Sequence, residues 1–215
     1  MFNMKLLSLT VGSLVLASTA TADFGGFTFT ENANAYGVTY QIFVELDAGD
    51  ELNAVSGNAV DSLVIGSDSG FMQATMFGAH WNTINDVNEG AFGFVPSLEY
   101  DSWIGIGYAP QGTDMATSPG FDFSGFETGN NLETANGAWY LTPGMAQGYE
   151  VGGSVLIGQF TVAAGDHVYG TVNLQGRNAD GSAWDAIGVS FDTIPAPGAL
   201  ALLGLAGLAA RRRRK

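Results

Sequence analysis

The chain has 215 residues, of which 46% are hydrophobic, 13% are charged, 31 are glycine and none is cysteine. This length allows one domain with targeting segments, and the lack of cysteine excludes disulfides and thiol nucleophiles. All 21 acidic residues lie between Asp23 and Asp192, where Arg177 is the one basic residue, so residues 23–193 carry a formal charge of −20. That charge disfavours binding to nucleic acid or to anionic membranes.

The N-terminus shows the three parts of a secretory signal peptide. Lys5 precedes an apolar run over residues 6–17, and the A-x-A pattern Ala20-Thr21-Ala22 follows. This order is typical of an exported chain that signal peptidase cleaves after the second alanine of the pattern. We therefore assign residues 1–22 to a signal peptide; the alternative is a short N-terminal helix in the core.

Residues 23–193 form the expected acidic domain, and their pattern is that of short β-strands. In residues 36–46, apolar Val38, Tyr40 and Ile42 lie at alternate positions with polar residues between them, which predicts a half-buried strand. Other runs are bounded by glycine, asparagine, aspartate or proline. They predict strands at residues 52–56, 62–66, 71–77, 97–107, 155–163, 168–176 and 186–191.

Two longer-range expectations follow from these runs. Residues 155–162 and 169–174 are expected to form a hairpin, and residues 110–137 are expected to hold long loops. The spacing of strands and turns predicts an all-β fold, an antiparallel β-sandwich or jelly roll. The order of the strands resembles the jelly rolls of cohesins and carbohydrate-binding modules, which is a likeness of fold alone.

Trp103 is the candidate ligand-binding residue of this domain. In the strand expected at residues 97–107 it shares the more polar face with Asp101 and Gly105. An indole on such a face could stack on a sugar ring. A carbohydrate-binding module would need Trp103 and other aromatic side chains in an exposed row. The alternative is that the tryptophans belong to the core.

No catalytic motif stands out in the sequence. His80 and His167 have neither a G-x-S-x-G elbow nor an H-E-x-x-H motif around them, so turn or surface histidines are the favoured interpretation. The 21 carboxylates could supply a glycosidase pair, but no pattern marks one. We therefore expect the chain not to be an enzyme, and a secreted hydrolase is the least favoured alternative.

Two acidic turns are candidate calcium loops. Asn178, Asp180 and Asp185 place oxygen ligands around a turn glycine, in a pattern that resembles the first half of a calcium loop. No glutamate closes this stretch into a twelve-residue EF-hand loop. Residues 47–51 form a second acidic turn. The alternative is that these residues are turn formers and that the chain needs no cofactor.

The C-terminus combines a Pro-x-Pro motif, an apolar stretch over residues 198–210 and a terminal cluster of cations. A helix over the apolar stretch spans roughly 20 Å, short of the roughly 30 Å hydrocarbon core, and snorkelling arginines could close part of the gap. We expect a transmembrane helix whose cations stay in the cytoplasm, with residues 23–193 outside. The motif residues are Pro195, Ala196 and Pro197, and the cluster comprises Arg211, Arg212, Arg213, Arg214 and Lys215.

This three-part tail, residues 194–215, resembles the PEP-CTERM sorting signal of Gram-negative bacteria, with Pro-Ala-Pro in place of the typical Pro-Glu-Pro. The resemblance implies recognition by an exosortase-type processing enzyme at the membrane and release of the body to the envelope or extracellular matrix. The alternative is an anchor that stays uncut. We therefore expect an exported, non-catalytic surface or matrix protein. The alternative is a secreted carbohydrate-binding module that binds extracellular polysaccharide, with or without calcium.

Overall fold

The computed structural model describes residues 24–78, 83, 87–108 and 118–194. The predicted signal peptide, with Ala20 and Ala22, and the predicted sorting residues from Pro195 to Arg214 lie outside these ranges. Within the described ranges, no helix is long and apolar enough to cross a membrane.

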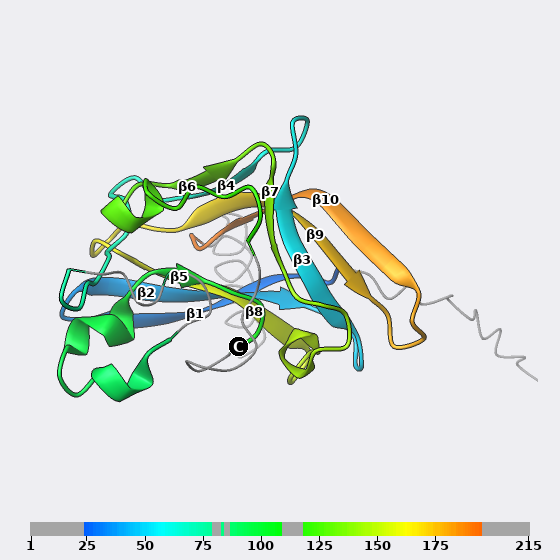
Figure 1. Cartoon of the computed structure of the whole chain (residues 1–215), viewed down its shortest axis with the longest axis horizontal. Helices are drawn as coiled ribbons and strands as arrows, with labels where there is room; N and C mark the ends of the chain where they lie inside the picture. The colour runs from blue at the N-terminus through cyan, green and yellow to red at the C-terminus, as the bar shows by residue number, and fades with distance from the viewer. Residues whose placement is uncertain (1–23, 79–82, 84–86, 109–117, 195–215) are drawn as a thin grey trace, which may run out of the picture.

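Two antiparallel sheets build the described domain, which confirms the predicted all-β class (Figure 1). The first sheet has the strand order β1-β2-β8-β5. Its strands are β1 (Gly26–Asn34), β2 (Gly37–Glu45), β8 (Ser154–Val162) and β5 (Trp103–Ile104). The β2–β8 pairing contains an irregularity between Ile42 and Phe43, whereas β1 pairs with β2 without interruption along its length.

The second sheet is organised around β9 (Tyr169–Arg177). One edge of β9 pairs with β10, and the other edge is shared by β4 and β3, which pair in turn with β6 and β7. The bounds of these strands are β3 (Glu51–Gly57), β4 (Leu63–Gly66), β6 (Leu132–Thr134), β7 (Gly137–Tyr140) and β10 (Ala183–Asp192). Four 3₁₀ turns complete the described elements: η1 (Glu89–Ala91), η2 (Pro96–Tyr100), η3 (Phe126–Thr128) and η4 (Ala146–Gly148).

Apolar side chains from both sheets form one buried cluster. Ile42 from β2, Phe160 from β8 and Leu174 from β9 are at most 1% exposed and belong to it. The alternation predicted for residues 36–46 is confirmed, because its apolar members face this cluster. Burial of this apolar surface is the main stabilising term available to a chain without disulfides.

The outer face of the first sheet is covered as well, by a stretch that we call the covering segment (residues 71–78 and 87–108). Its Met72 N–H donates to the Thr161 carbonyl on β8 over 2.8 Å. Trp103 of this segment packs with Leu156 of β8 and Phe43 of β2 in a second apolar cluster. Strand β8 is therefore buried on both faces, and η1 and η2 lie outside the sheet at the lower left of Figure 1.

The structure corrects several of the predicted strands. Residues 71–77 are not a strand, and the strand expected at 97–107 shrinks to Trp103–Ile104 after the turn η2. Both stretches lie in the covering segment, where most apolar side chains outside β5 are buried against one another, as Ala74 and Leu98 are, and Trp103 is buried against the sheet. Strands β1, β6 and β7 were not predicted, because β1 is largely exposed and the other two are only three and four residues long.

The predicted hairpin of residues 155–162 and 169–174 is wrong. Strand β8 pairs with β2 and β5, whereas β9 pairs with β3, β4 and β10, so the two strands belong to different sheets. The connection at residues 163–168 crosses from one sheet to the other. Ser67 and Ser69 hold it in place by donating hydrogen bonds to the Asp166 carboxylate over 2.7 and 2.6 Å.

Candidate functional site

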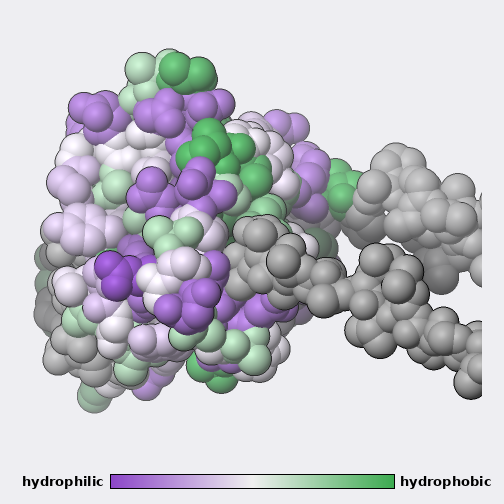
Figure 2. Space-filling view, turned by 90° about the vertical axis from the view of Figure 1, so that its right-hand side faces the viewer, coloured by the Kyte–Doolittle hydropathy of each residue, from purple (hydrophilic) through white to green (hydrophobic). Residues whose placement is uncertain are grey.

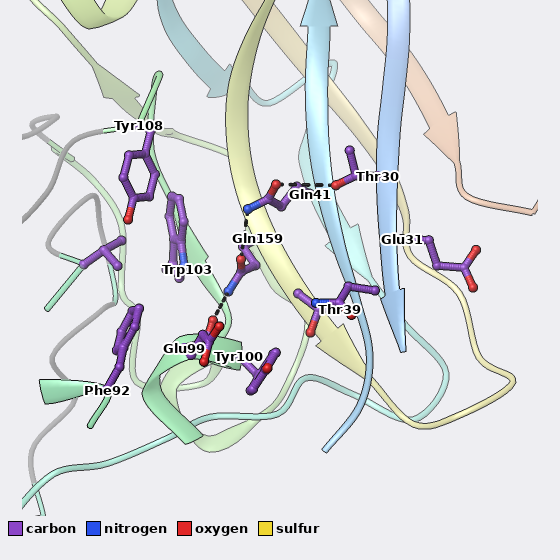
Figure 3. A pocket seen from close by; sticks show the side chains of 12 residues that line it. Thr30, Glu31, Thr39, Gln41, Phe92, Glu99, Tyr100, Trp103, Tyr108 and Gln159 are labelled. Carbon is purple, nitrogen blue, oxygen red and sulfur yellow. Dashed lines mark hydrogen bonds between the residues drawn. The ribbon is translucent and has the colours of Figure 1, made fainter. Parts of the chain in front are cut away.

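A cleft of about 380 Å³ lies between the outer face of the first sheet and the covering segment. Strands β1, β2 and β8 supply polar side chains to it, and the covering segment supplies aromatic ones (Figure 3). Its lining residues are Thr30, Glu31, Asn32, Thr39, Gln41, Val87, Phe92, Glu99, Tyr100, Trp103, Tyr108 and Gln159.

A chain of amide hydrogen bonds forms the polar side of the cleft. Thr30 Oγ1 donates to Gln41 Oε1 over 3.4 Å, and Gln41 Nε2 donates to Gln159 Oε1 over 3.1 Å. Gln159 Nε2 then donates to the carbonyls of Glu99 and Asp101 over 3.0 and 2.9 Å. Figure 3 shows this series running from β1 across β2 and β8 to the covering segment. Each link orients the next, so the amides are preorganised.

The two glutamines meet because of strand register. Gln41 on β2 is the direct partner of Gln159 on β8, so both side chains point to the outer face. Gln159 is 6% exposed, and its amide is satisfied by three partners. A buried amide without such partners would lower stability by about 1–3 kcal/mol. The series therefore fastens the covering segment to the sheet as well as lining the cleft.

Aromatic rings form the opposite side of the cleft. The ring of Tyr108 lies 6.2 Å from that of Trp103, with the planes inclined at 56°. Tyr108 is 46% exposed and donates its hydroxyl hydrogen to Glu89. Burial and the neighbouring Glu89 carboxylate raise the pKa of Tyr108 above its usual range, so the hydroxyl stays a neutral donor. Phe92 and Tyr100 are partly exposed and continue this side.

Asp101 supports the covering segment from beneath the cleft. Its carboxylate Oδ1 accepts hydrogen bonds from the N–H groups of Ala74 and Ser102 over 2.7 and 2.9 Å. The side chain is 1% exposed, and this burial raises the pKa of Asp101 to about 7 in spite of the two hydrogen bonds. Asp101 is therefore a structural group that keeps its proton in the folded state up to about pH 7.

The carboxylates that line the cleft do not converge. Figure 3 shows the Glu31 side chain pointing away from the aromatic residues, whereas Glu99 lies beside Gln159 on the other side of β2. A glycosidase needs two carboxyl groups about 5–10 Å apart on either side of one bond. The cleft thus has amide groups on one side and aromatic rings on the other.

The structure places the predicted ligand residue Trp103 in the cleft wall but leaves only 1% of it exposed. Trp139 and Trp184 are 0% and 6% exposed, and the Trp139 indole donates to the Gly105 carbonyl over 2.8 Å. These three tryptophans therefore form no exposed stacking row. Trp81, the fourth tryptophan, lies outside the described residues.

His167 lies between two carboxylates. Its Nδ1 is 3.5 Å from Asp166 and its Nε2 is 3.8 Å from Asp192. Partial burial would raise the pKa of Asp166, but hydrogen bonds from Ser69, Ser67 and the His167 N–H outweigh it and hold that pKa well below its usual range. Asp166 is thus an anionic anchor for the crossing loop. His80 lies outside the described residues.

The predicted calcium residues Asn178, Asp180 and Asp185 lie on the β9–β10 hairpin, where Asn178 and Asp180 both form hydrogen bonds with Ser182. Asp180 Oδ1 accepts hydrogen bonds from the backbone and hydroxyl of Ser182 over 2.8 and 2.6 Å, which is the role of a turn former. Asp185 lies on β10 opposite Gln175. Among the residues that the structure describes, no group of three or more histidine, aspartate or glutamate side chains could hold a metal ion.

Comparison of the chain with protein-family models, with curated proteins and with solved structures gave no match. The cleft is therefore interpreted from its own chemistry. Sequence analysis missed Gln41, Gln159 and Tyr108 as a group. Alternation did place Gln41 on the polar face of its strand, but Gln159 lies 118 residues away and only the register brings the two together.

Proposed function

We propose that this chain is an exported, non-catalytic protein of the cell surface or extracellular matrix, sorted through its C-terminal tail. The signal-peptide pattern and the tail with Pro195, Ala196 and Pro197 support export and sorting. The formal charge of −20 on residues 23–193 supports a soluble body outside the cell that repels nucleic acid. Signal peptidase and an exosortase-type enzyme are the partners that this proposal requires.

The cleft supports a second proposal, that the domain binds a neutral extracellular polysaccharide. The observation that carries it is the preorganised amide series of Gln41 and Gln159 facing the partly exposed ring of Tyr108. Sugar hydroxyls pair with amides, and sugar ring faces pack on aromatic rings. The acidic body disfavours polyanionic glycans. Because Glu31 points away from the other cleft residues, binding is better supported than hydrolysis.

We also propose a more specific fold for this domain. Two antiparallel sheets that share one apolar cluster support a β-sandwich of the jelly-roll kind, as in cohesins and carbohydrate-binding modules. In this proposal the covering segment is an addition on the outer face of one sheet. A domain of this kind would present its ligand cleft on a sheet face and not at the loop tips.

Sorting is tested by mass spectrometry of terminal peptides from native protein, separated into cell envelope and culture medium. We expect a mature N-terminus at Asp23 and loss of the residues after about Pro197 in the released fraction. An intact C-terminus that ends in Arg214-Lys215 and occurs only in the membrane fraction would overturn the sorting proposal.

Polysaccharide binding is tested by affinity electrophoresis of the full-length chain in gels that contain neutral or anionic polysaccharides. Tyr108→Ala and Gln41→Ala are expected to weaken retardation by a neutral polysaccharide about tenfold. Tyr140→Ala is the matched control, since Tyr140 is 40% exposed on β7 and does not line the cleft. Equal effects of Tyr108→Ala and Tyr140→Ala, or no retardation by any neutral polysaccharide, would refute the proposal.

A further inference from the structure

The two acidic turns that are far apart in the sequence meet in space. Pairing of Glu51 with Arg177 brings the start of β3 to the end of β9, and the turns that precede β3 and follow β9 come together. Asp50 Oδ1 accepts a hydrogen bond from the Ala179 N–H over 2.8 Å. A side-chain carbon added at Gly49 would lie 3.1 Å from the Ala179 side chain, so the two turns are in direct contact.

Each turn contributes one buried oxygen that lacks a hydrogen-bond partner. They are Asp50 Oδ2 and Asn178 Oδ1. Asp50 as a whole is 2% exposed, and its other oxygen is already engaged by Ala179 of the opposite turn, so its carboxyl group lies at the contact between the two turns. A buried carboxylate oxygen without a partner is strongly unfavourable. Asn178 directly precedes Ala179, so both unpartnered oxygens belong to residues at the contact between the two turns.

The orientation of the Asn178 amide is set by its neighbours. Asn178 Nδ2 donates to Ser182 Oγ over 2.9 Å. Ser182 Oγ in turn donates to Asp180 over 2.6 Å, so it can accept from the amide nitrogen but cannot donate to the amide oxygen. Asn178 Oδ1 is therefore directed away from Ser182. The amide presents its oxygen, not its nitrogen, at the junction.

We propose that this junction binds a calcium ion between Asp50 Oδ2 and Asn178 Oδ1. A hard divalent cation takes carboxylate and amide oxygens and completes six to eight positions with backbone carbonyls and water. The negative charge of the body raises the local cation concentration. Two protein side chains imply weak binding, with Kd on the order of 10⁻⁴–10⁻³ M, which suits an extracellular domain.

This site differs from the loop expected from the sequence. Asn178 is retained as a ligand, whereas Asp180 is occupied by Ser182 and Asp185 lies on the strand. Its partner is Asp50, which belongs to the other acidic turn. Calcium would link the β2–β3 connection, which runs from the first sheet to the second, to the β9–β10 hairpin of the second sheet. The site is independent of the cleft and of the proposed polysaccharide.

The test is titration of the full-length chain with calcium after treatment with a chelator, by calorimetry and by thermal unfolding at constant ionic strength. We expect one weak site, and a rise in the unfolding midpoint of about 3–6 °C at about ten times Kd. Magnesium should give a smaller rise, because it demands octahedral geometry. Asp50→Asn should abolish both the heat of binding and the rise.

Two further variants keep the proposal testable if Asp50→Asn does not fold. Asn178→Ala removes the ligand oxygen and the bond to Ser182, whereas Ser182→Ala removes the same bond but keeps the oxygen. We expect Asn178→Ala to abolish calcium binding, Ser182→Ala to weaken it without abolishing it because the oxygen remains but loses its fixed orientation, and Asp185→Asn to leave it unchanged. An equal response to magnesium and calcium that survives in Asn178→Ala would mean general charge screening. No response to calcium would mean that water fills the junction, and either result would overturn the proposal.

Discussion

Strands β8 and β10 are similar in length, yet their surroundings differ. Eight of the nine residues of β8 are buried, whereas β10 is mostly exposed or half-buried and forms an edge of the second sheet. Figure 2 views the molecule from the right-hand side of Figure 1, and hydrophilic residues cover most of the face it shows. The difference arises from the covering segment, which lies on the outer face of the first sheet.

The covered face explains why polar residues occur inside β8. Gln159 and Thr161 alternate with apolar Phe160, as in a half-exposed strand, but all three are buried. Thr161 Oγ1 lies 2.6 Å from Thr39 Oγ1, and the Thr161 N–H donates to Ser102 Oγ over 3.0 Å. Polar side chains on a covered face must find partners within the protein, and this requirement turns the face into an ordered hydrogen-bond network. The cleft is the part of that face left open.

The largest expected loss of stability comes from a substitution in the apolar core between the two sheets. Phe160 is fully buried and its ring lies 5.2 Å from that of Phe71. Phe160→Ala should lower the free energy of unfolding by about 3–5 kcal/mol, since it removes apolar contacts and leaves a cavity. Urea denaturation measures the change, with Phe160→Leu as a milder control. A loss below 1 kcal/mol would mean that the two sheets do not share a packed core.

The adjacent residue probes the covered outer face. Gln159→Leu keeps a similar volume but leaves the Gln41 amide and the carbonyls of Glu99 and Asp101 without their partner. We expect a loss of about 2–3 kcal/mol in urea denaturation, together with faster amide hydrogen exchange in the covering segment. If exchange there is unchanged, then Gln159 does not fasten the segment to the sheet.

Asp101 makes the stability of the covered face depend on pH. Because its pKa rises to about 7 on folding, from a usual value of 3.8, the folded state holds the proton more tightly. The resulting stabilisation is fully present below about pH 4 and is lost as the pH rises through about 7. Asp101→Asn keeps a hydrogen-bond acceptor without the charge.

From pH 4 to pH 8, we expect the free energy of unfolding of Asp101→Asn to rise relative to that of the parent chain by up to about 4 kcal/mol. Thermal unfolding of the variant and the parent chain across this range measures the difference. A constant difference between the two chains at every pH would show that the charge of Asp101 is not the cause.

The smallest change in stability is expected from a substitution on the open face of the second sheet. Ser190 on β10 lies 2.8 Å from Thr171 Oγ1, and this pair is exposed to solvent. Ser190→Ala should change the free energy of unfolding by less than about 0.5 kcal/mol, because water replaces the lost partner. If Ser190→Ala lowered the free energy of unfolding as much as Gln159→Leu, the covered and the open face would not differ in how strongly their polar side chains stabilise the fold.

The sequence predicted those parts of the fold that local patterns report. The strands β2, β3, β4, β8 and β9 lie close to their predicted bounds, because their apolar residues alternate or run continuously between turn formers. The same signal misassigned residues 71–77, since burial against a sheet and burial within one give similar runs. The export and sorting segments stay predictions, because they lie outside the described residues.

The candidate sites depended on contacts that no local pattern contains. Gln41 faces Gln159 across 118 residues, and Asp50 contacts Ala179 across 129. The spacing of the strands was compatible with many pairings. The predicted hairpin of β8 and β9 is wrong because it paired two strands that are neighbours in sequence but belong to different sheets. The sequence also placed Trp103 on a polar face, although packing on Leu156 of β8 and Phe43 of β2 buries it.

The amino-acid sequence by itself determined the all-β class and the acidic body, because composition, charge and period-two alternation are local properties, and it predicts the targeting segments. Only the tertiary structure decided which sheet face is covered, which amides meet and which turns join. These features follow from strand register and from packing between distant segments. A slip of one residue in the pairing of β8 would move Gln159 to the core face and Phe160 to the outer face.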